Sequence, residues 1–176
     1  MATPERVLLI GMMGAGKTTT GRLLADRLSW RYLDSDDQIE QETGRTVPEI
    51  WKADGEAAFR REESRVLAEA CATADRVVVS VAGGAVLDRG NRDLIATSGL
   101  TVWLRADVGT LARRVGSGTG RPLLEGGPVA ALRRLSAERE PLYAELADMA
   151  FDVDRMSPPQ VVDAIVAGMS GHEETG

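Results

Sequence analysis

Two adjoining stretches decide the fold of this chain: residues 6–10 read RVLLI, and residues 11–18 read GMMGAGKT. The first stretch is almost wholly apolar and rich in branched side chains, which is typical of a β-strand buried on both faces. From Lys17 to Leu28, leucines recur at helical spacing beside charged residues, so a helix begins where the glycines end. A buried strand, a glycine-rich turn and a helix are therefore expected in direct succession.

The turn between strand and helix matches the pattern G-x-x-x-x-G-K-[ST] at every position. Glycines let the backbone N–H groups point inward, which forms an anion-binding nest at the start of a helix. Lys17 can reach the β- and γ-phosphates of a nucleoside triphosphate, and Thr18 offers a hydroxyl to Mg²⁺. A glycine-rich turn that holds Lys-Thr by coincidence is the alternative. The ATP-binding residues expected from this loop are Gly14, Ala15, Gly16, Lys17, Thr18 and Thr19.

Outward from this unit, apolar runs alternate with amphipathic segments along the whole chain. Strands are expected at residues 32–33, 77–81, 100–104 and 151–153, and helices at 55–70, 89–96, 107–115, 129–146 and 158–169. A further helix is expected to start in the acidic cluster 34–37 and to run through Ile39 and Glu40. Alternation of this kind predicts a parallel sheet with helices on both faces. We therefore predict one three-layer α/β/α domain over residues 1–176, with a central parallel five-stranded sheet of the P-loop NTPase type.

Two segments are expected to be mobile. The glycine-rich stretch 116–127 contains Arg121-Pro122, and a flexible loop with one arginine suits a lid that closes over phosphates. Residues 170–176 are expected to form a frayed tail.

The composition excludes several classes of protein. The chain of 176 residues has 21 Lys and Arg against 27 Asp and Glu, which gives a net charge of −6, so a broad basic surface for nucleic acid is not expected. One cysteine, Cys71, excludes an internal disulfide, and the single His172 argues against a histidine-based metal site or triad. The apolar run at 7–10 is too short for a signal segment or a membrane span. We expect a cytoplasmic monomer without nucleic-acid or membrane partners.

Two carboxylates are the candidates for metal and proton chemistry. No strand ends in the apolar run plus Asp that holds magnesium in many nucleotide-binding proteins, whereas Asp34 and Asp36 follow the second expected strand. The carboxyl ends of parallel strands share one edge of the sheet, so both residues are expected beside the phosphate loop. One could lie near Mg²⁺ while the other accepts a proton from an attacking hydroxyl. Simple capping of the next helix is the alternative.

Three arginines are candidates for binding anions. Arg60 and Glu63 are three residues apart on one expected helix, so Glu63 could hold the guanidinium, although a solvated charged face would look the same. Arg121 lies in the expected lid. Arg139 precedes Pro141, which interrupts the helix expected over 129–146, and this position alone is typical of a helix end.

Taken together, these motifs resemble those of the shikimate kinase family, which has a nucleoside-monophosphate-kinase-like P-loop fold. The matching pieces, in order, are GMMGAGKTT, LDSD, GRTVPEI, GEAAFRREE, AGGAV, GRPLL and REPLY, between about residues 7 and 155. The phosphate loop is common to many families, whereas the remaining set in this order is much more specific.

The resemblance implies the phosphorylation of the shikimate 3-hydroxyl by ATP, with Mg²⁺ as cofactor. Lys17 and Thr18 would serve ATP and Mg²⁺, and Asp34 would support the metal. Asp36 would hydrogen-bond the shikimate hydroxyls and act as base. The resemblance also assigns Arg60 and Arg139 to the shikimate carboxylate, the backbone of Gly83 and Gly84 to the pocket lining, Arg121 to the phosphates, Arg114 and Arg155 to the adenine, and Trp51 and Phe59 to the apolar walls.

Two departures concern the acceptor side. The family's usual triple glycine is Ala82-Gly83-Gly84 here, and Trp51 stands where phenylalanine is common. They leave open which alcohol is phosphorylated. The alternatives are a paralogous kinase for another small hydroxy acid, such as gluconate, or a cyclitol, and a nucleotide-binding regulatory protein without acceptor chemistry.

Overall fold

The computed structural model describes residues 4–118 and 121–171. The strands are β1 (Arg6–Ile10), β2 (Arg31–Asp34), β3 (Val77–Ser80), β4 (Leu100–Arg105) and β5 (Met149–Asp152). The helices are α1 (Lys17–Leu28), α2 (Ser35–Thr43), α3 (Val47–Asp54), α4 (Glu56–Ala72), α5 (Arg89–Ser98), α6 (Val108–Val115), α7 (Pro128–Leu146) and α8 (Pro158–Gly171). Short 3₁₀ turns lie at Ala85–Leu87 and Pro122–Leu124.

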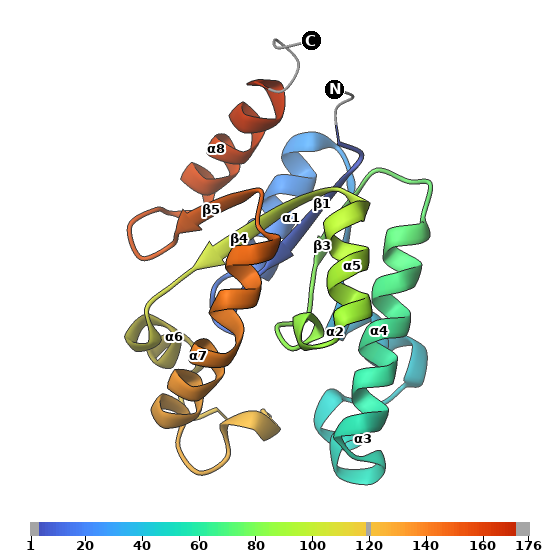
Figure 1. Cartoon of the computed structure of the whole chain (residues 1–176), viewed down its shortest axis with the longest axis vertical. Helices are drawn as coiled ribbons and strands as arrows, with labels where there is room; N and C mark the ends of the chain where they lie inside the picture. The colour runs from blue at the N-terminus through green and yellow to red at the C-terminus, as the bar shows by residue number, and fades with distance from the viewer. Residues whose placement is uncertain (1–3, 119–120, 172–176) are drawn as a thin grey trace.

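The strands form one five-stranded parallel sheet in the order β2-β3-β1-β4-β5. Figure 1 shows α5 and α7 in front of the sheet and α1 behind it, and α8 packs against α1. The predicted three-layer parallel architecture is therefore confirmed. Because β1 lies between β3 and β4, the chain crosses the sheet in both directions from β1, and the turn after β1 opens at the switch point where ligands bind in such sheets.

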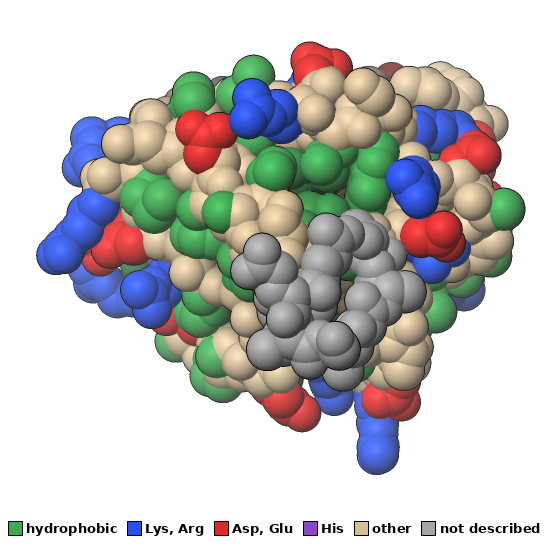
Figure 2. All heavy atoms as spheres, turned by 90° about the horizontal axis from the view of Figure 1, so that it is seen from above, with side chains coloured by type: hydrophobic (Ala, Val, Ile, Leu, Met, Phe, Trp, Pro, Cys, Tyr) green, Lys and Arg blue, Asp and Glu red, His purple; other side chains and the backbone are tan. Residues whose placement is uncertain are grey.

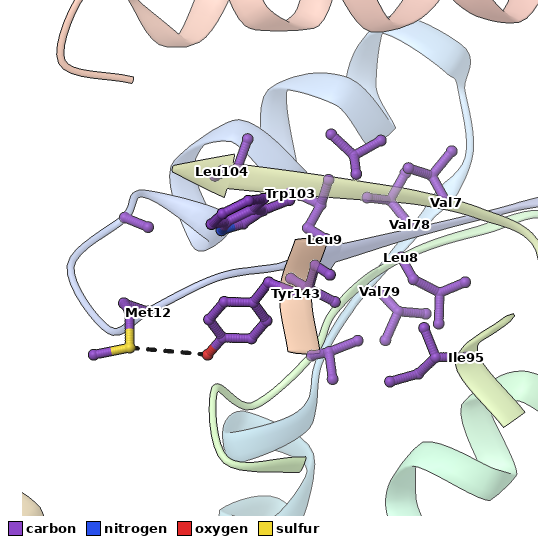
Figure 3. Close-up of a cluster of buried hydrophobic side chains, with 14 of the residues drawn as sticks. Val7, Leu8, Leu9, Met12, Val78, Val79, Ile95, Trp103, Leu104 and Tyr143 are labelled. Carbon is purple, nitrogen blue, oxygen red and sulfur yellow. Dashed lines mark hydrogen bonds between the residues drawn. The ribbon is translucent and has the colours of Figure 1, made fainter. Parts of the chain in front are cut away.

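The main core lies on both faces of the central strands. Val7, Leu8 and Leu9 of β1 have no exposed surface, and Val77–Ser80 of β3 is buried at every residue. Figure 3 shows side chains of β1 and β3 with Trp103 of β4 and Tyr143 of α7, and the ring centroids of Trp103 and Tyr143 are 5.9 Å apart. Burial on both faces explains why the strands are continuous apolar runs without polar alternation.

A second, smaller cluster supports the side of the sheet near β2. It consists of Ile39, Ile50, Phe59 and Val66, which join α2, α3 and α4. The start of α3 is fixed by a capping box, in which Thr46 accepts a hydrogen bond from the Glu49 backbone and the Glu49 carboxylate accepts one from the Thr46 backbone. The cluster packs α2, α3 and α4 together, and Leu33 of β2 packs against both this cluster and the main core.

Helix α7 runs without a break through Pro141, in agreement with the helix expected over 129–146, although the proline taken alone is typical of a helix end. Proline forfeits one backbone hydrogen bond, but Arg139 and Tyr143 on either side of it are almost fully buried, and this packing keeps the helix together. At the other end of the chain, Ser170 is helical and donates to the Val166 carbonyl, and the rest of the predicted tail, 172–176, lies outside the described residues.

The outer surface carries charges of both signs. Figure 2 shows the end of the molecule from which both termini emerge, and basic and acidic side chains are interspersed around it. Within residues 4–118 and 121–171, no helix is both long and apolar enough to cross a membrane.

Candidate active site

A cleft of about 450 Å³ opens at the carboxyl edge of the sheet. Its walls come from the phosphate loop, the end of β2, the α3–α4 pair, the loop 81–84 after β3, and α7. Of the residues expected in the site, it is lined by Gly14, Gly16, Lys17, Thr18, Thr19, Asp34, Asp36, Trp51, Phe59, Arg60, Gly83, Gly84, Arg121 and Arg139. The fold therefore brings together side chains that are more than 120 positions apart in the sequence.

The phosphate loop has the backbone that an anion nest requires. Gly14 and Gly16 have φ of 81° and 91°, in the left-handed region that glycine enters without strain, and Gly16 directly precedes α1. The Lys17 ammonium donates to the carbonyls of Gly11 (2.8 Å) and Met12 (3.0 Å). Burial lowers the pKa of Lys17 to about 8, against the opposing charges of Asp36 and Asp34. A phosphate arriving at this loop would meet both inward N–H groups and a desolvated cation.

Asp34 caps α2 and also contacts Thr18 of the phosphate loop. Its Oδ1 accepts hydrogen bonds from the backbone N–H groups of Asp36 (3.0 Å) and Asp37 (3.4 Å), so it caps α2. Its Oδ2 accepts from the Thr18 hydroxyl at 3.1 Å. A threonine hydroxyl and a carboxylate beside a phosphate site are the hard oxygen donors that Mg²⁺ takes, and the ion's other ligands are usually waters and phosphate oxygens. The donor set at Thr18 and Asp34 therefore fits magnesium.

Asp36 is the second carboxylate of the cleft. Partial desolvation, followed by the negative charge of Asp34, raises the pKa of Asp36 to about 6, although its carboxyl is open to solvent. Among described residues, no group of three or more His, Cys, Asp or Glu is arranged to hold a metal ion. The pKa of Asp36 is closer to neutrality than that of an ordinary aspartate, which is a property that suits a proton acceptor.

Arg60 is held in place from several directions. The buried carboxylate of Glu63 lies 2.6 Å from one guanidinium nitrogen, and Glu56 lies 3.3 Å from the other. The guanidinium also lies 5.7 Å from the ring centroids of Trp51 and Phe59, which contact each other. The pair Arg60–Glu63 is therefore not a solvated charged face. Burial raises the pKa of Glu63 to about 7, and the Arg60 charge opposes that rise.

Arg139 enters the cleft from the opposite side and is only 1% exposed. Its Nε is buried without a hydrogen-bond partner. A Cβ placed on Gly83 would lie 3.3 Å from an Arg139 nitrogen, and one on Gly84 would lie 2.1 Å from an Arg60 nitrogen. The two glycines therefore let the loop 81–84 lie directly against both guanidinium groups.

Tyr143 of α7 contacts both the loop 81–84 and the phosphate loop, and the sequence did not indicate it as a site residue. It lies one helical turn after Arg139 on α7, and its hydroxyl donates to the Gly83 carbonyl at 2.7 Å. The hydroxyl also lies 3.9 Å from the Met12 sulfur of the phosphate loop (Figure 3). The i, i+4 spacing from Arg139 is the signal by which Tyr143 could have been found.

The expected lid is described in part. Residues 116–118 and 121–127 are described, whereas 119–120 lie outside the described residues. Arg121 lines the mouth of the cleft with an exposed side chain, and Leu124 is buried against the main core. Leu124 thus attaches this segment to the main core, and Arg121 faces the main cleft.

A second cavity, of about 270 Å³, lies on the far side of the phosphate loop, where the adenine was expected. It is lined by Arg114 with Ala15, Gly16, Thr19, Thr20, Val153, Met156, Pro158 and Val161. Arg114 donates to the Gly14 carbonyl at 3.1 Å and reaches the Val153 carbonyl at 3.4 Å. The structure does not bring Arg155 to this cavity: its side chain is 86% exposed and lies 3.6 Å from Asp152.

The fold and the two adjoining cavities define the class of the protein, a kinase of the nucleoside-monophosphate-kinase-like P-loop type. The sequence model of the family "Shikimate kinase" matches residues 13–170. The chain therefore belongs to the shikimate kinase family, and the resemblance seen in its motifs is confirmed.

Individual relatives agree over nearly the whole length. The shikimate kinase of Thiobacillus denitrificans is 43% identical over 171 residues, covering 97% of this chain and 88% of the relative. The shikimate kinase of Symbiobacterium thermophilum is also 43% identical, and the match covers 97% of this chain and 99% of the relative. The solved structure of the shikimate kinase from Acinetobacter baumannii in complex with shikimate has a TM-score of 0.92 at 34% identity. The match covers 97% of this chain and 95% of that structure's chain. A gluconokinase from Sinorhizobium meliloti, at 21% identity and a TM-score of 0.63, shares the fold alone.

Proposed function

We propose that this chain transfers the γ-phosphoryl group of ATP to the 3-hydroxyl of shikimate, which gives ADP and shikimate 3-phosphate. Family membership and the near-complete coverage of its relatives support the reaction. The single observation that carries the assignment to this cleft is the presence of Arg60 and Arg139 opposite the phosphate loop. Guanidinium groups bind carboxylates in a bidentate manner, and shikimate has one carboxylate.

The acceptor is bound by its charge and oriented by its hydroxyls. Arg60 and Arg139 bind the carboxylate, and the ion pair with the buried Glu63 orients Arg60 toward it. Trp51 and Phe59 contact the ring, and the backbone of Gly83 and Gly84 completes the pocket. This orientation presents the 3-hydroxyl to the phosphate loop, so the reaction becomes one between two positioned groups.

Asp36 accepts the proton as the 3-hydroxyl oxygen attacks the γ-phosphorus. With a pKa of about 6, its carboxylate is ionised at neutral pH and yet is a stronger base than an ordinary aspartate. The bond between the γ-phosphorus and the bridging oxygen breaks, and the electron pair remains on ADP. Lys17 and Arg121 stabilise the negative charge on the transferred group and on the leaving oxygen.

The nucleotide occupies both cavities. The loop Gly14–Thr19 receives the phosphates, and Arg114 serves the adenine side. When bound, Mg²⁺ would neutralise phosphate charge, and Thr18 and Asp34 are the residues that would hold it.

The whole chain acts as one domain and as a cytoplasmic monomer. The segment 116–127 closes over the phosphates and excludes water that would hydrolyse ATP. Neither nucleic acid nor a membrane is a partner.

An acceptor panel tests the proposal. ADP release is measured with shikimate, gluconate and several cyclitols, and the phosphorylated position is read by NMR. Shikimate is expected to exceed the others in kcat/KM by at least about 100-fold, because an acceptor without its carboxylate or hydroxyls leaves site groups unpaired. Equal turnover of gluconate or a cyclitol would contradict the assignment, and nucleotide binding without acceptor-stimulated ADP release would indicate a regulatory protein.

A further inference from the structure

A chain of hydroxyl contacts leads from the start of α1 to the Asp34 carboxylate. Ser80, the last residue of β3, donates from Oγ to the Lys17 backbone carbonyl at 3.1 Å. The Tyr32 hydroxyl lies 2.9 Å from Ser80 Oγ and 3.1 Å from Asp34 Oδ2. Neither Tyr32 nor Ser80 has a role in the reaction described above, although Ser80 lines the cleft.

The sheet and α1 fix where the Tyr32 hydroxyl lies. Tyr32 is two residues before Asp34 on β2, so both side chains are on one face of the sheet, and Asp34 is paired in register with Ser80. The ring lies against Gly21 of α1, where an added Cβ would be 2.5 Å from a ring carbon of Tyr32. A rigid ring between a strand and a helix gives its hydroxyl little freedom.

The contacts of Asp34 show what this hydroxyl contributes. Oδ1 accepts from two backbone N–H groups, and Oδ2 accepts from the Thr18 hydroxyl and lies at the same 3.1 Å from the Tyr32 hydroxyl. Because the Ser80 proton is used on the Lys17 carbonyl, Ser80 Oγ and Asp34 Oδ2 are the two acceptors open to the single Tyr32 proton. An ionised carboxylate is the stronger acceptor. The Tyr32 hydroxyl therefore donates to Asp34 Oδ2, the same oxygen that accepts from the Thr18 hydroxyl.

We propose that Tyr32 is a positioning residue, whose hydroxyl holds the Asp34 carboxylate in the orientation that Thr18 and a nucleotide-bound Mg²⁺ require. The inference rests on the proposed function, since it assigns Tyr32 a role toward the metal of that reaction. The alternative is a purely structural role, in which the Tyr32 ring fills the space beside Gly21 and the hydroxyl contributes nothing. Tyr32→Phe keeps the ring and removes the hydroxyl, so it separates the two roles.

The experiment measures the binding of ADP by calorimetry with and without MgCl₂. The ratio of the two dissociation constants reports how strongly the metal and the nucleotide bind together. Loss of an outer hydrogen bond to a metal-supporting group commonly weakens metal affinity by about 10-fold. Tyr32→Phe is therefore expected to reduce the ratio by about 10-fold and to raise the Mg²⁺ concentration for half-maximal activity similarly, while the KM for shikimate stays within about twofold.

Ser98→Ala is the control, because it removes another half-buried hydroxyl, one that donates to the Leu94 carbonyl within α5 and lines neither cavity. Its Mg²⁺ ratio is expected to equal that of the wild type. An equal loss in both variants, or no loss in Tyr32→Phe, would overturn the inference. A wild-type chain whose ADP binding ignores Mg²⁺ would instead contradict the proposed function.

A double-mutant cycle gives a second, independent test. If Tyr32 acts through Asp34, then Tyr32→Phe has no further effect on the Mg²⁺ ratio once Asp34→Asn is present. Additive effects of the two substitutions would show that the hydroxyl acts by another route and would overturn the inference. The thermal midpoint of each variant verifies that the compared chains are folded.

Discussion

At the scale of single residues, the two arginines of the cleft differ in how they are held. Arg60 is braced by carboxylates on its own helix, with Glu63 at 2.6 Å and Glu56 at 3.3 Å. Arg139 is almost completely buried, and its Nε has no hydrogen-bond partner. A buried donor without a partner costs free energy, so Arg139 gains more than Arg60 when an anion arrives.

Removing either guanidinium is expected to weaken acceptor binding selectively. In Arg60→Ala and Arg139→Ala, the KM for shikimate rises by roughly 10- to 150-fold, which corresponds to the loss of about 1.5–3 kcal/mol for a charge-assisted contact. The KM for ATP is expected to change by much less, because neither side chain lines the second cavity, to which we assign the adenine. Steady-state kinetics with each substrate varied in turn checks this. Arg61→Ala, at the exposed neighbour outside the main cleft, is the control, and equal effects on both substrates would count against the carboxylate role.

The pH dependence follows from Asp36 and Lys17. The pKa of Asp36 is raised to about 6, and Asp36 must be ionised to accept a proton, so activity falls as the pH drops below about 6. The pKa of Lys17 is lowered to about 8, and Lys17 must be protonated to hold phosphate, so activity falls above about pH 8. Rates measured with both substrates far below their KM values, which report the free enzyme, should show both limbs. An acid limb near pH 4 would mean that Asp36 is an ordinary carboxylate or is not the base.

At the scale of secondary-structure elements, the loop 81–84 is the piece on which the acceptor site depends. It follows β3 directly, it lies between the helices that carry Arg60 and Arg139, and Tyr143 holds its Gly83 carbonyl. Gly84 has φ of −87°, which any residue can adopt, so glycine is needed there for space rather than for conformation. Helices α4 and α7, which are far apart in the sequence, thus place their arginines against Gly83 and Gly84.

Gly84→Ala is expected to disturb the site more than the fold. The new methyl group would collide with the Arg60 guanidinium, which is the far end of a flexible side chain and can turn aside. The KM for shikimate should therefore rise at least about 10-fold through displacement of one charged contact, while the thermal midpoint changes little. Kinetics and thermal unfolding measured on the same preparation check both parts. Gly109→Ala in α6, where an added Cβ meets only an ordinary contact, is the control, and a large loss of stability in Gly84→Ala alone would contradict this reading.

At the scale of the whole molecule, a chain of net charge −6 binds two anions. The main cleft is lined by four cationic side chains and four carboxylates, which are Lys17, Arg60, Arg121, Arg139, Asp34, Asp36, Glu40 and Glu63. The anionic groups of a ligand are therefore bound by direct contact with individual cations, and salt screens part of that attraction. The net negative charge of the chain does not prevent such contacts, because exposed charges more than about 10 Å away are largely screened.

Salt is expected to act on binding rather than on turnover. When NaCl is raised from about 50 mM to about 500 mM, the Debye length falls from more than 10 Å to less than 5 Å, so the KM for shikimate should rise several-fold. The kcat should change little, because the bound acceptor is shielded from solvent in the cleft. Kinetics at a series of NaCl concentrations measure this, with K₂SO₄ avoided because sulfate competes for anion sites. A falling kcat at constant KM would contradict the expectation.

Local patterns in the sequence predicted most of the fold. The strands, the helices after them and the parallel three-layer arrangement followed from apolar runs, helical spacing and alternation, because each depends on neighbours in the chain. The helix expected over 129–146 forms despite Pro141 for a tertiary reason, because burial of Arg139 and Tyr143 outweighs the hydrogen bond that proline forfeits. A pattern within one segment contains no information about that packing.

The phosphate loop is the part of the site that the sequence determined by itself. Glycine conformation, inward N–H groups and the following helix are properties of one short, continuous segment. Only the tertiary structure decided that Arg60 is braced rather than solvated, that Asp34 both caps α2 and meets Thr18, and that Tyr32 and Tyr143 hold the pieces together. These relations join residues of different elements, and they exist because the parallel sheet brings the ends of its strands to one edge, where burial fixes the charges and hydrogen bonds of the side chains.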